Sequence, residues 1–238
     1  MEVIPLGDSA LIVRLRDRFE DAPNETANEV QRALGRLKAA AIPGVIEFAP
    51  AYTTVGMFFD PVKVVAAGAK ATEVFDWLAE RIRVELSHHP RGRGDARSTA
   101  QLVEVPVCYD PEFGVDLDVV ARHAQISASE VVDLHSKTEY RVSCVGFTPG
   151  FPFLSGMPGK LATPRRATPR KEIPAGSVGI GGAQTGVYPM RSPGGWNLIG
   201  RTPLRLFDPQ KNPPVLLQAG DRVRFNAITR EEFDRLSS

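Results

Sequence analysis

The chain has 238 residues, of which 42% are hydrophobic and 24% are charged, and its formal net charge is +1. These values are typical of a soluble protein with one large or two small domains. The near-neutral charge argues against a general role at nucleic acids or membrane surfaces, and no apolar run approaches the roughly 20 residues of a membrane-spanning helix.

The cysteines and the start of the chain bear on the compartment. Cys108 and Cys144 form neither a C-x-x-C pair nor a disulfide framework. Residues 1–15 contain no basic segment followed by a long apolar run, so we expect no signal peptide. These features predict a cytoplasmic protein.

Residues 1–90 are expected to form a small α+β domain. β-branched and aromatic residues gather between turn residues at four predicted strands: 3–4, 10–13, 45–48 and 53–59. Asp60-Pro61 is expected to be a turn after the last of these strands. Asn24 is expected to cap one helix and Thr72 a second, and in both helices apolar residues repeat every three to four positions. The alternation of strand pairs and helices indicates two packed layers.

Residues 91–100 are expected to form a linker, because the segment from His88 to Ala100 is poor in apolar residues and rich in Gly, Arg and Ser. The adjacent His88 and His89 have no further His, Cys or carboxylate at a spacing suited to metal ligands. We therefore expect no metal site.

Residues 101–238 are expected to form the second domain. Two short helices are predicted at 117–123 and 128–136, and Ser127 with Glu130 fits a capping box for the second helix. The pair resembles a helix-turn-helix in outline, but its second helix carries Glu130 and Asp133 and no Arg or Lys before Lys137, so we do not expect DNA binding. Strands are predicted at 102–107, 140–145, 215–217 and 222–226, and a helical turn at 231–236.

The stretch from Gly146 to Arg205 differs from the rest of the chain. It holds 12 of the 21 glycines and 9 of the 20 prolines, a density typical of linkers, yet hydrophobic residues are spaced through it. It therefore predicts short strands joined by tight loops. Eight of its residues are basic and one, Glu172, is acidic. An ordered, Arg-rich surface suits a small anionic molecule, because a guanidinium pairs with carboxylate or phosphate at two points; the alternative is a solvated loop surface.

Two nucleotide-binding motifs are incomplete in this stretch. A P-loop would need Ser or Thr after Gly159-Lys160, where Leu161 stands. A dinucleotide fingerprint that starts at Gly179 would need a glycine where Gln184 stands. Neither motif is therefore present, and whether a nucleotide contacts this chain stays open at this point.

Four segments carry a resemblance to a known family: GFTPGFPFLSGMP, LATPRRATPRKEIPAGSVGIGG, QTGVYPMRSPGGWNLIGRTP and LFDP. They resemble the bacterial PxpB/KipI family of 5-oxoprolinase subunits, which is also known as allophanate hydrolase subunit 1 or as carboxyltransferase subdomains C and D. The N-terminal PLGDSALIV, together with His135, Tyr140 and Val142, also fits this family. The resemblance implies an α+β N-terminal domain followed by a mainly β, cyclophilin-like barrel domain.

The resemblance also implies a function. Such a chain works with PxpA-like and PxpC-like partners as an ATP-dependent 5-oxoprolinase, which opens 5-oxoproline to glutamate. We expect the chain to be inactive alone and ATP to be bound by the complex rather than by this chain. Two alternatives stay open: a KipI-like inhibitor of a sensor histidine kinase, and a subunit of a biotin-dependent carboxyltransferase or allophanate-type amidohydrolase.

Within this resemblance, an anionic or lactam substrate calls for positioned cations and amide-reading groups. The candidate catalytic residues are His135, Arg165 and Arg170. The candidate substrate-binding residues are Gln184, Tyr188, Gly194, Gly195, Trp196 and Arg201. Barrel packing is the alternative for the glycines and for the tryptophan, and a structural role near a helix end is the alternative for the histidine.

Overall fold

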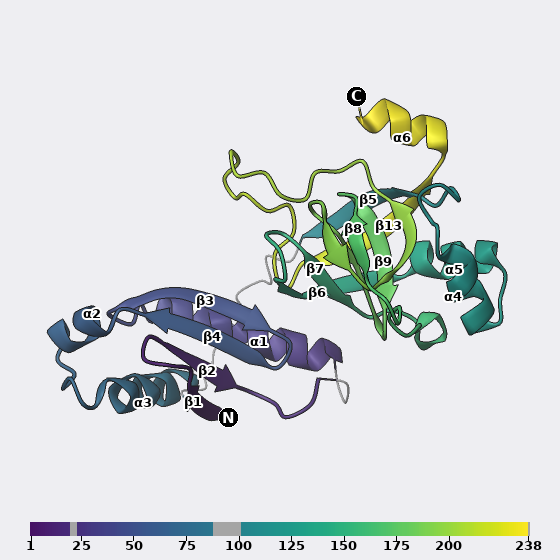
Figure 1. Cartoon of the computed structure of the whole chain (residues 1–238). Helices are drawn as coiled ribbons and strands as arrows, with labels where there is room; N and C mark the ends of the chain where they lie inside the picture. Colours follow the sequence, from purple (N-terminus) through teal and green to yellow (C-terminus); the bar gives the residue numbers. More distant parts are fainter. Residues whose placement is uncertain (20–22, 88–100, 238) are drawn as a thin grey trace. The chain divides into compact units, whose positions relative to one another are not determined.

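The computed structural model describes residues 1–19, 23–87 and 101–237. The chain divides into two compact units, residues 1–99 and 100–238, and each is described by itself (Figure 1). The predicted linker 91–100 and the pair His88 and His89 lie outside the described residues. Within the described ranges, none of the helices is long and apolar enough to cross a membrane.

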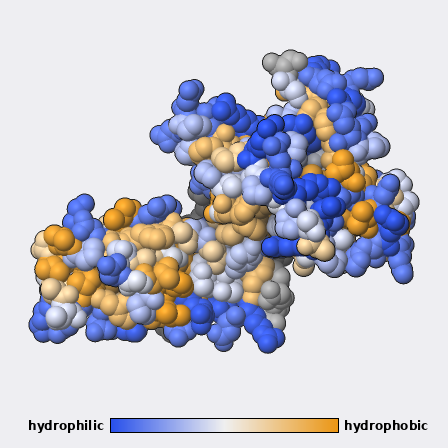
Figure 2. All heavy atoms as spheres, in the orientation of Figure 1, coloured by the Kyte–Doolittle hydropathy of each residue, from blue (hydrophilic) through white to orange (hydrophobic). Residues whose placement is uncertain are grey.

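The first unit is a four-stranded antiparallel sheet with helices on one face (Figure 1). In spatial order its strands are β1 (Glu2–Pro5), β2 (Ala10–Arg14), β4 (Thr54–Phe59) and β3 (Val45–Ala51). Its helices are α1 (Pro23–Ala39), α2 (Pro61–Ala66) and α3 (Val74–Ser87). Apolar residues of all three helices share one core with the sheet. Outside this core, Ile46 and Phe58 are exposed, and Figure 2 shows hydrophobic residues gathered over this unit.

All four predicted strands of this unit are confirmed, but the helices differ in detail. Helix α1 begins at Pro23, so Asn24 lies inside the first turn rather than at the cap. Helix α3 begins at Val74, two residues after the expected cap. The short helix α2 was not predicted, because Asp60-Pro61 also fits a turn; here the Asp60 carboxylate caps the helix by accepting the N–H groups of its first turn.

The second unit is built around a closed barrel of seven strands, which confirms the predicted barrel. Around the ring the strands are β10 (Gln184–Val187), β7 (Pro152–Ser155), β6 (Glu139–Val145), β13 (Arg222–Ile228), β5 (Leu102–Cys108), β12 (Asn197–Arg201) and β9 (Ser177–Gly181). All neighbours are antiparallel except β13 and β5, which run parallel. A separate two-stranded sheet joins β8 (Arg170–Ile173) and β11 (Ser192–Gly194).

One predicted strand of this unit is wrong. Residues 215–217 form no strand, and Val215 makes only an isolated bridge to Phe207. Besides this bridge, the Leu216 N–H donates to the Leu206 carbonyl at 2.8 Å, and the preceding Pro213-Pro214 has no N–H group that could extend the pairing. The short apolar run therefore packs as a loop.

Two helices cover part of the barrel. Helix α4 (Leu117–Ala124) packs on β12, and α5 (Ala128–Lys137) packs on β13. The predicted capping box at the start of α5 is confirmed, with Ser127 and Glu130 each accepting the other's backbone N–H. Because the buried faces of both helices lie against the barrel, they act as its cover.

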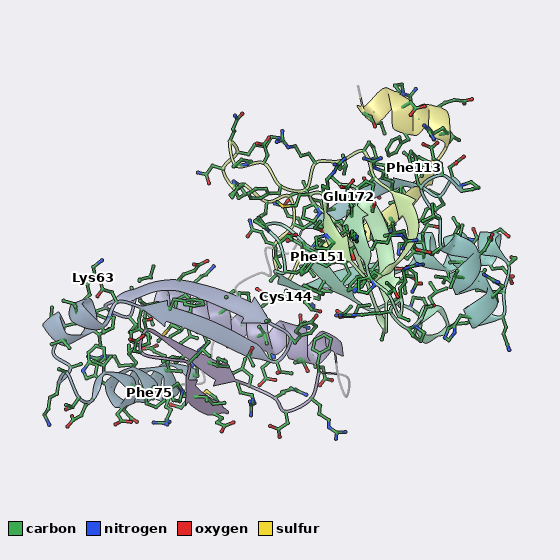
Figure 3. The ribbon with its side chains drawn as sticks, viewed as in Figure 1. Lys63, Phe75, Phe113, Cys144, Phe151 and Glu172 are labelled. Carbon is green, nitrogen blue, oxygen red and sulfur yellow. The ribbon has the colours of Figure 1, made fainter. Side chains whose placement is uncertain are left out.

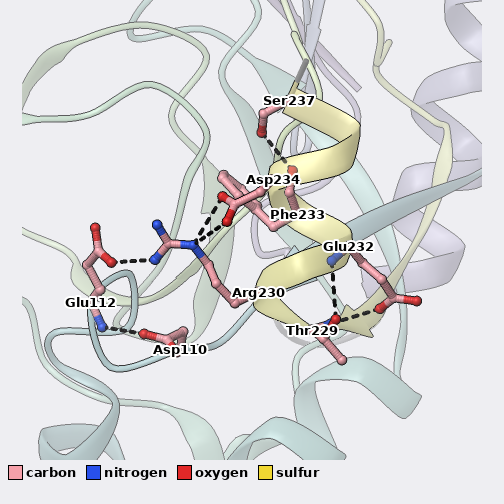
Figure 4. Close-up of polar contacts among 8 residues, drawn as sticks. All are labelled: Asp110, Glu112, Thr229, Arg230, Glu232, Phe233, Asp234 and Ser237. Atoms are coloured by element: carbon pink, nitrogen blue, oxygen red, sulfur yellow. Dashed lines mark hydrogen bonds and ion pairs between the residues drawn. The ribbon is translucent and has the colours of Figure 1, made fainter.

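The last helix, α6 (Arg230–Ser237), is fastened to the turn after β5 (Figure 4). Arg230 pairs with Glu112 and with Asp234, and its guanidinium carbon lies 4.6 Å from the centre of the Phe113 ring. Phe233 packs on the same Phe113 ring at a centroid distance of 4.6 Å. Figure 3 labels Phe113 close to this helix. The C-terminal helix is therefore part of the second unit rather than a loose tail.

Candidate functional site

An open groove of about 500 Å³ lies between α4 and the segment that joins the short 3₁₀ turn (Gly159–Leu161) to β8. Its lining combines cations, hydroxyls, one amide and a few apolar groups. The lining residues are Val119, His123, Thr163, Pro164, Arg165, Arg166, Ala167, Thr168 and Asn197. The tripeptide Thr-Pro-Arg occurs twice in the basic stretch from Gly146 to Arg205, at 163–165 and at 168–170, and both copies contribute residues to this wall.

A buried carboxylate anchors this wall. Asp116 is 3% exposed, and its Oδ1 accepts hydrogen bonds from Arg166 Nη1 and Arg170 Nη2, both at 2.9 Å. Its Oδ2 lies 2.8 Å from Arg170 Nη1 and accepts the backbone N–H of Leu198 at 2.8 Å. Arg170 is thus held at two points by Asp116. The neighbouring Arg165 is exposed and has its charge available to the groove.

A layer of aromatic side chains lies behind the basic wall, on the outside of the barrel. Trp196 is 4% exposed and packs against Phe151 and Phe153, with ring centroids 5.4 and 5.9 Å apart. Phe151 is labelled beside the barrel in Figure 3. The Arg165 guanidinium carbon lies 5.8 Å from the centre of the Trp196 ring, within the range of a cation–π contact. The indole therefore supports an arginine of the groove wall from behind.

The glycines of the barrel make room for this indole. A Cβ atom at Gly181 would lie 2.5 Å from Trp196 Cδ1, and a Cβ at Gly186 would lie 3.1 Å from its Cζ3. Neighbouring residues of the same strands, such as Val178 and Ile180, belong to the barrel core. The glycine density of this stretch thus lets a large ring lie flat against two strands.

Tyr188 and the loop before Trp196 belong to the same region. Burial raises the pKa of Tyr188, against the lowering effect of a backbone hydrogen bond from Trp196 and of the nearby Arg165 and Arg170. The Gly195 carbonyl accepts the backbone N–H of Arg166 at 2.7 Å. A Cβ atom at Gly194 would collide with the Tyr188 hydroxyl. These candidate residues therefore lie behind the groove wall and contact it, but none of them lines the groove itself.

The remaining candidates lie elsewhere. Arg201 donates its Nε hydrogen to the Ala175 carbonyl at 2.9 Å, and its guanidinium faces Phe113 at 5.7 Å from the ring centre. Gln184 stands on β10 opposite Gly181. Neither residue lines the groove.

His135 is fully buried in the second unit. Its Nδ1 lies 2.7 Å from the Tyr109 hydroxyl and its Nε2 lies 2.9 Å from Thr185 Oγ1, and the ring stacks on Phe225 at 4.5 Å. Because the Thr185 hydroxyl donates to the Gly179 carbonyl, it accepts the proton of His135 Nε2, and Nδ1 accepts the tyrosine proton. Burial lowers the pKa of His135 to about 3. These contacts favour the structural alternative over a proton carrier.

This burial predicts a pH dependence of stability. The folded His135 stays neutral, whereas in the unfolded chain it takes up a proton below its ordinary pKa of 6.5. As the pH is lowered from 6.5 to 5, we therefore expect the free energy of unfolding to decrease. The decrease should approach about 1.4 kcal/mol per pH unit. His135→Gln should remove that slope in urea unfolding, whereas His123→Gln should retain it. An unchanged slope in His135→Gln would contradict the assignment.

Sequence reasoning missed two residues of this site, Asp116 and Asn197. Asp116 occupies the N-cap position of α4, but its side chain makes no cap hydrogen bond and instead pairs with arginines 50 and 54 positions later in the chain. An aspartate before a helix ordinarily indicates a cap, so the local pattern pointed to a different role. Asn197 follows a tryptophan in a Gly-rich loop and carries no motif of its own.

The described residues contain no group of three or more His, Cys, Asp or Glu side chains placed to hold a metal ion. What the groove offers is positive charge at Arg165, hydroxyl groups at Thr163 and Thr168, and an amide at Asn197. This arrangement can bind and orient a small anion, and it can stabilise negative charge that develops on an oxygen atom.

Comparison with known proteins gives a consistent picture. The family model of the carboxyltransferase domain, subdomain C and D, matches residues 1–217. The B-type 5-oxoprolinase subunit of Bacillus subtilis is 44% identical over 234 residues, which cover 98% of this chain and 95% of that protein. The corresponding 5-oxoprolinase subunit of Escherichia coli O157:H7 is 41% identical, over 92% of this chain and 93% of that protein.

Solved structures share the fold. The crystal structure of the protein TTHA0988 matches with a TM-score of 0.73 and 36% identity over 92% of this chain. The chain spans 40% of the length of that protein.

Proposed function

Because the chain belongs to the family of the carboxyltransferase domain, subdomain C and D, we propose that it is a subunit of an ATP-dependent 5-oxoprolinase, which hydrolyses 5-oxoproline to glutamate together with PxpA-like and PxpC-like partner chains. In this proposal the chain is inactive alone and acts in the cytoplasm. Its groove between α4 and the Thr-Pro-Arg segment supplies part of a site that the partners complete.

One observation carries the proposal: the likeness to a protein named as a 5-oxoprolinase subunit extends over 98% of this chain at 44% identity. A match of this extent covers both units and the whole groove wall. The chemistry of the groove supports the same function, since an exposed Arg165 faces a space wide enough for a small ring compound.

Hydrolysis of a lactam acid is favoured by positive charge in the site. Hydrolysis breaks the bond between the lactam carbonyl carbon and its nitrogen, forms a bond from that carbon to the oxygen of water, and leaves a proton on the released amine. Negative charge develops on the carbonyl oxygen, and the substrate already carries a carboxylate. In the proposal Arg165 binds one of these anionic groups, while Arg166 and Arg170 are held in place by Asp116 and keep the wall rigid.

In this proposal the groove binds the acid substrate rather than ATP. It offers cations for a phosphoryl group, but its lining as described has no Gly-rich phosphate loop and has few apolar groups for a purine: Val119, Pro164 and Ala167. We therefore assign ATP to the partner chains in this proposal.

Reconstitution tests this function. The chain is purified with PxpA-like and PxpC-like partners, and glutamate formation from 5-oxoproline is assayed with and without ATP while one subunit at a time is left out. We expect activity that needs ATP and all three chains. A stable three-chain complex that forms no glutamate would overturn the proposal.

Arg165→Ala should lower kcat/KM of the assembled enzyme by about 10- to 100-fold, the range expected from the loss of a charge-assisted hydrogen bond. Arg191→Ala is the matched control, because it removes the same charge from an exposed side chain that pairs with Glu172 outside the groove. We expect the control to stay within about twofold of the unmodified enzyme. Equal losses in the two variants would show that the effect comes from overall charge, and the assignment of Arg165 to the site would then be wrong.

A further inference from the structure

The amide of Asn197 is fixed in one orientation. This residue is 2% exposed and lines the groove. Its Nδ2 donates to the Pro164 carbonyl at 2.9 Å and to the Ile180 carbonyl at 3.2 Å. A flipped amide would place Oδ1 against these two carbonyl oxygens, so the hydrogen-bond pattern sets which end is which.

Oδ1 is therefore the free end of this amide. It has no hydrogen-bond partner within the part of the chain that the structure describes. Both protons of the amide are already used, so Asn197 can offer a ligand only an acceptor. Oδ1 is not among the side-chain atoms that are both buried and without a partner, so it is open to the groove, where the N–H group of a ligand can donate to it.

The rest of the groove defines the other end of such a ligand. Arg165 and Arg166 contribute positive charge, and the buried Nε of Arg166 has no hydrogen-bond partner among the described residues. Apolar contact comes from Val119 and Pro164. One small space thus combines an acceptor, cations and apolar groups, which matches a compact molecule with an N–H donor and a negative charge.

We propose that Asn197 Oδ1 accepts the ring N–H of a small lactam acid whose carboxylate is bound by Arg165, and that Asn197 thereby determines specificity in this groove. This inference rests on the proposed function and extends it, because it names the group that distinguishes a lactam acid from a cyclic acid without N–H. A ring oxygen in the same place would face Oδ1 and repel it, since both atoms are acceptors.

A series of ring isosteres tests this inference without any change to the fold. The affinities of 5-oxoproline, of 3-oxocyclopentane-1-carboxylate (CH₂ in place of N–H) and of 5-oxotetrahydrofuran-2-carboxylate (oxygen in place of N–H) are measured by calorimetry. The full-length chain and the assembled complex are both used, without nucleotide. We expect 5-oxoproline to bind about 3- to 10-fold more tightly than the carbocycle, and the lactone to bind most weakly. Equal affinities, or no binding of any ligand to chain and complex, would overturn the inference.

Two variants test the contacts at the two ends of the ligand separately. Arg165→Ala should weaken all three ligands by a similar factor and leave their ratios unchanged, because an arginine cannot accept an N–H. Asn197→Leu should abolish the preference for N–H; if it proves unstable, the isostere ratios in the unmodified chain and in Arg165→Ala still decide. Ratios that collapse in Arg165→Ala would contradict the assignment of N–H to Asn197.

The outcomes also separate this inference from the proposed function. Hydrolysis of 5-oxoproline by the reconstituted complex together with equal isostere affinities would retain the function and overturn the role of Asn197. Absence of hydrolysis together with a clear preference for the N–H ligand would support the role of Asn197 in a lactam-acid site and overturn the proposed reaction.

Discussion

Asp116→Ala is expected to lower the unfolding free energy of the second unit by about 3 kcal/mol, because it removes one partner of a buried ion-pair cluster. The carboxylate accepts hydrogen bonds from two arginines and from the Leu198 backbone. Without it, the guanidinium groups of Arg166 and Arg170 lie side by side with no compensating charge. Urea unfolding of the full-length chain measures the loss.

The control for this prediction is Asp118→Ala. This residue is exposed in the first turn of the same helix, so its removal takes away the same charge and should cost no more than about 1 kcal/mol. A double-mutant cycle adds a second check: Arg170→Ala should cost much less in the Asp116→Ala background than alone. Additive effects, or equal losses for the two aspartates, would show that the cluster does not stabilise the fold as argued.

Trp196→Ala is expected to cost about 3–5 kcal/mol of unfolding free energy, the range for removal of a large buried aromatic side chain. The indole is 4% exposed and fills the space between Phe151, Phe153 and the glycines of the barrel wall. Its loss also removes the surface that supports Arg165. We therefore expect both lower stability and weaker ligand binding in the groove.

The reciprocal change tests the same contact from the barrel side. Gly181→Ala places a Cβ atom 2.5 Å from the indole and should cost about 1–3 kcal/mol by overpacking. Gly159→Ala is the matched control, since a Cβ there meets nothing within 4 Å, and we expect a change within about 0.5 kcal/mol. In the Trp196→Ala background, Gly181→Ala should lose most of its cost. A full cost in that background would mean that the glycine is needed for another reason.

The features that could be predicted from the sequence depend on local signals. The capping box at Ser127 and Glu130 lies within four residues, and it marked the start of α5 correctly. The four strands of the first unit were found because turn residues separate their apolar runs. In the stretch after Gly146 the residues alone indicated short strands and loops, and the closed barrel was expected from the family resemblance.

The features that could not be predicted depend on contacts between distant residues. Asp116 meets Arg166 and Arg170 across 50 and 54 positions, and no local pattern specifies such a pair. The same holds for Trp196, whose ring lies on glycines of β9 and β10, so those glycines pointed equally well to close approach of a ligand. The sequence identified the arginines as a basic cluster. Which of them are paired and which, such as Arg165, are exposed depends on where the Asp116 carboxylate lies.

The parallel pairing of β5 with β13 affects how the protein is made. β13 is the last of the strands in the described residues and lies between β5 and β6, pairing with β5 from Arg222↔Leu102 to Ile228↔Cys108. During synthesis the ring therefore stays open until β13 has left the ribosome, and until then both neighbouring strands keep an unpaired edge. Contacts between such distant segments form slowly. The second unit thus completes its folding late, and a chain that stops before β13 retains two edges that can pair with other chains.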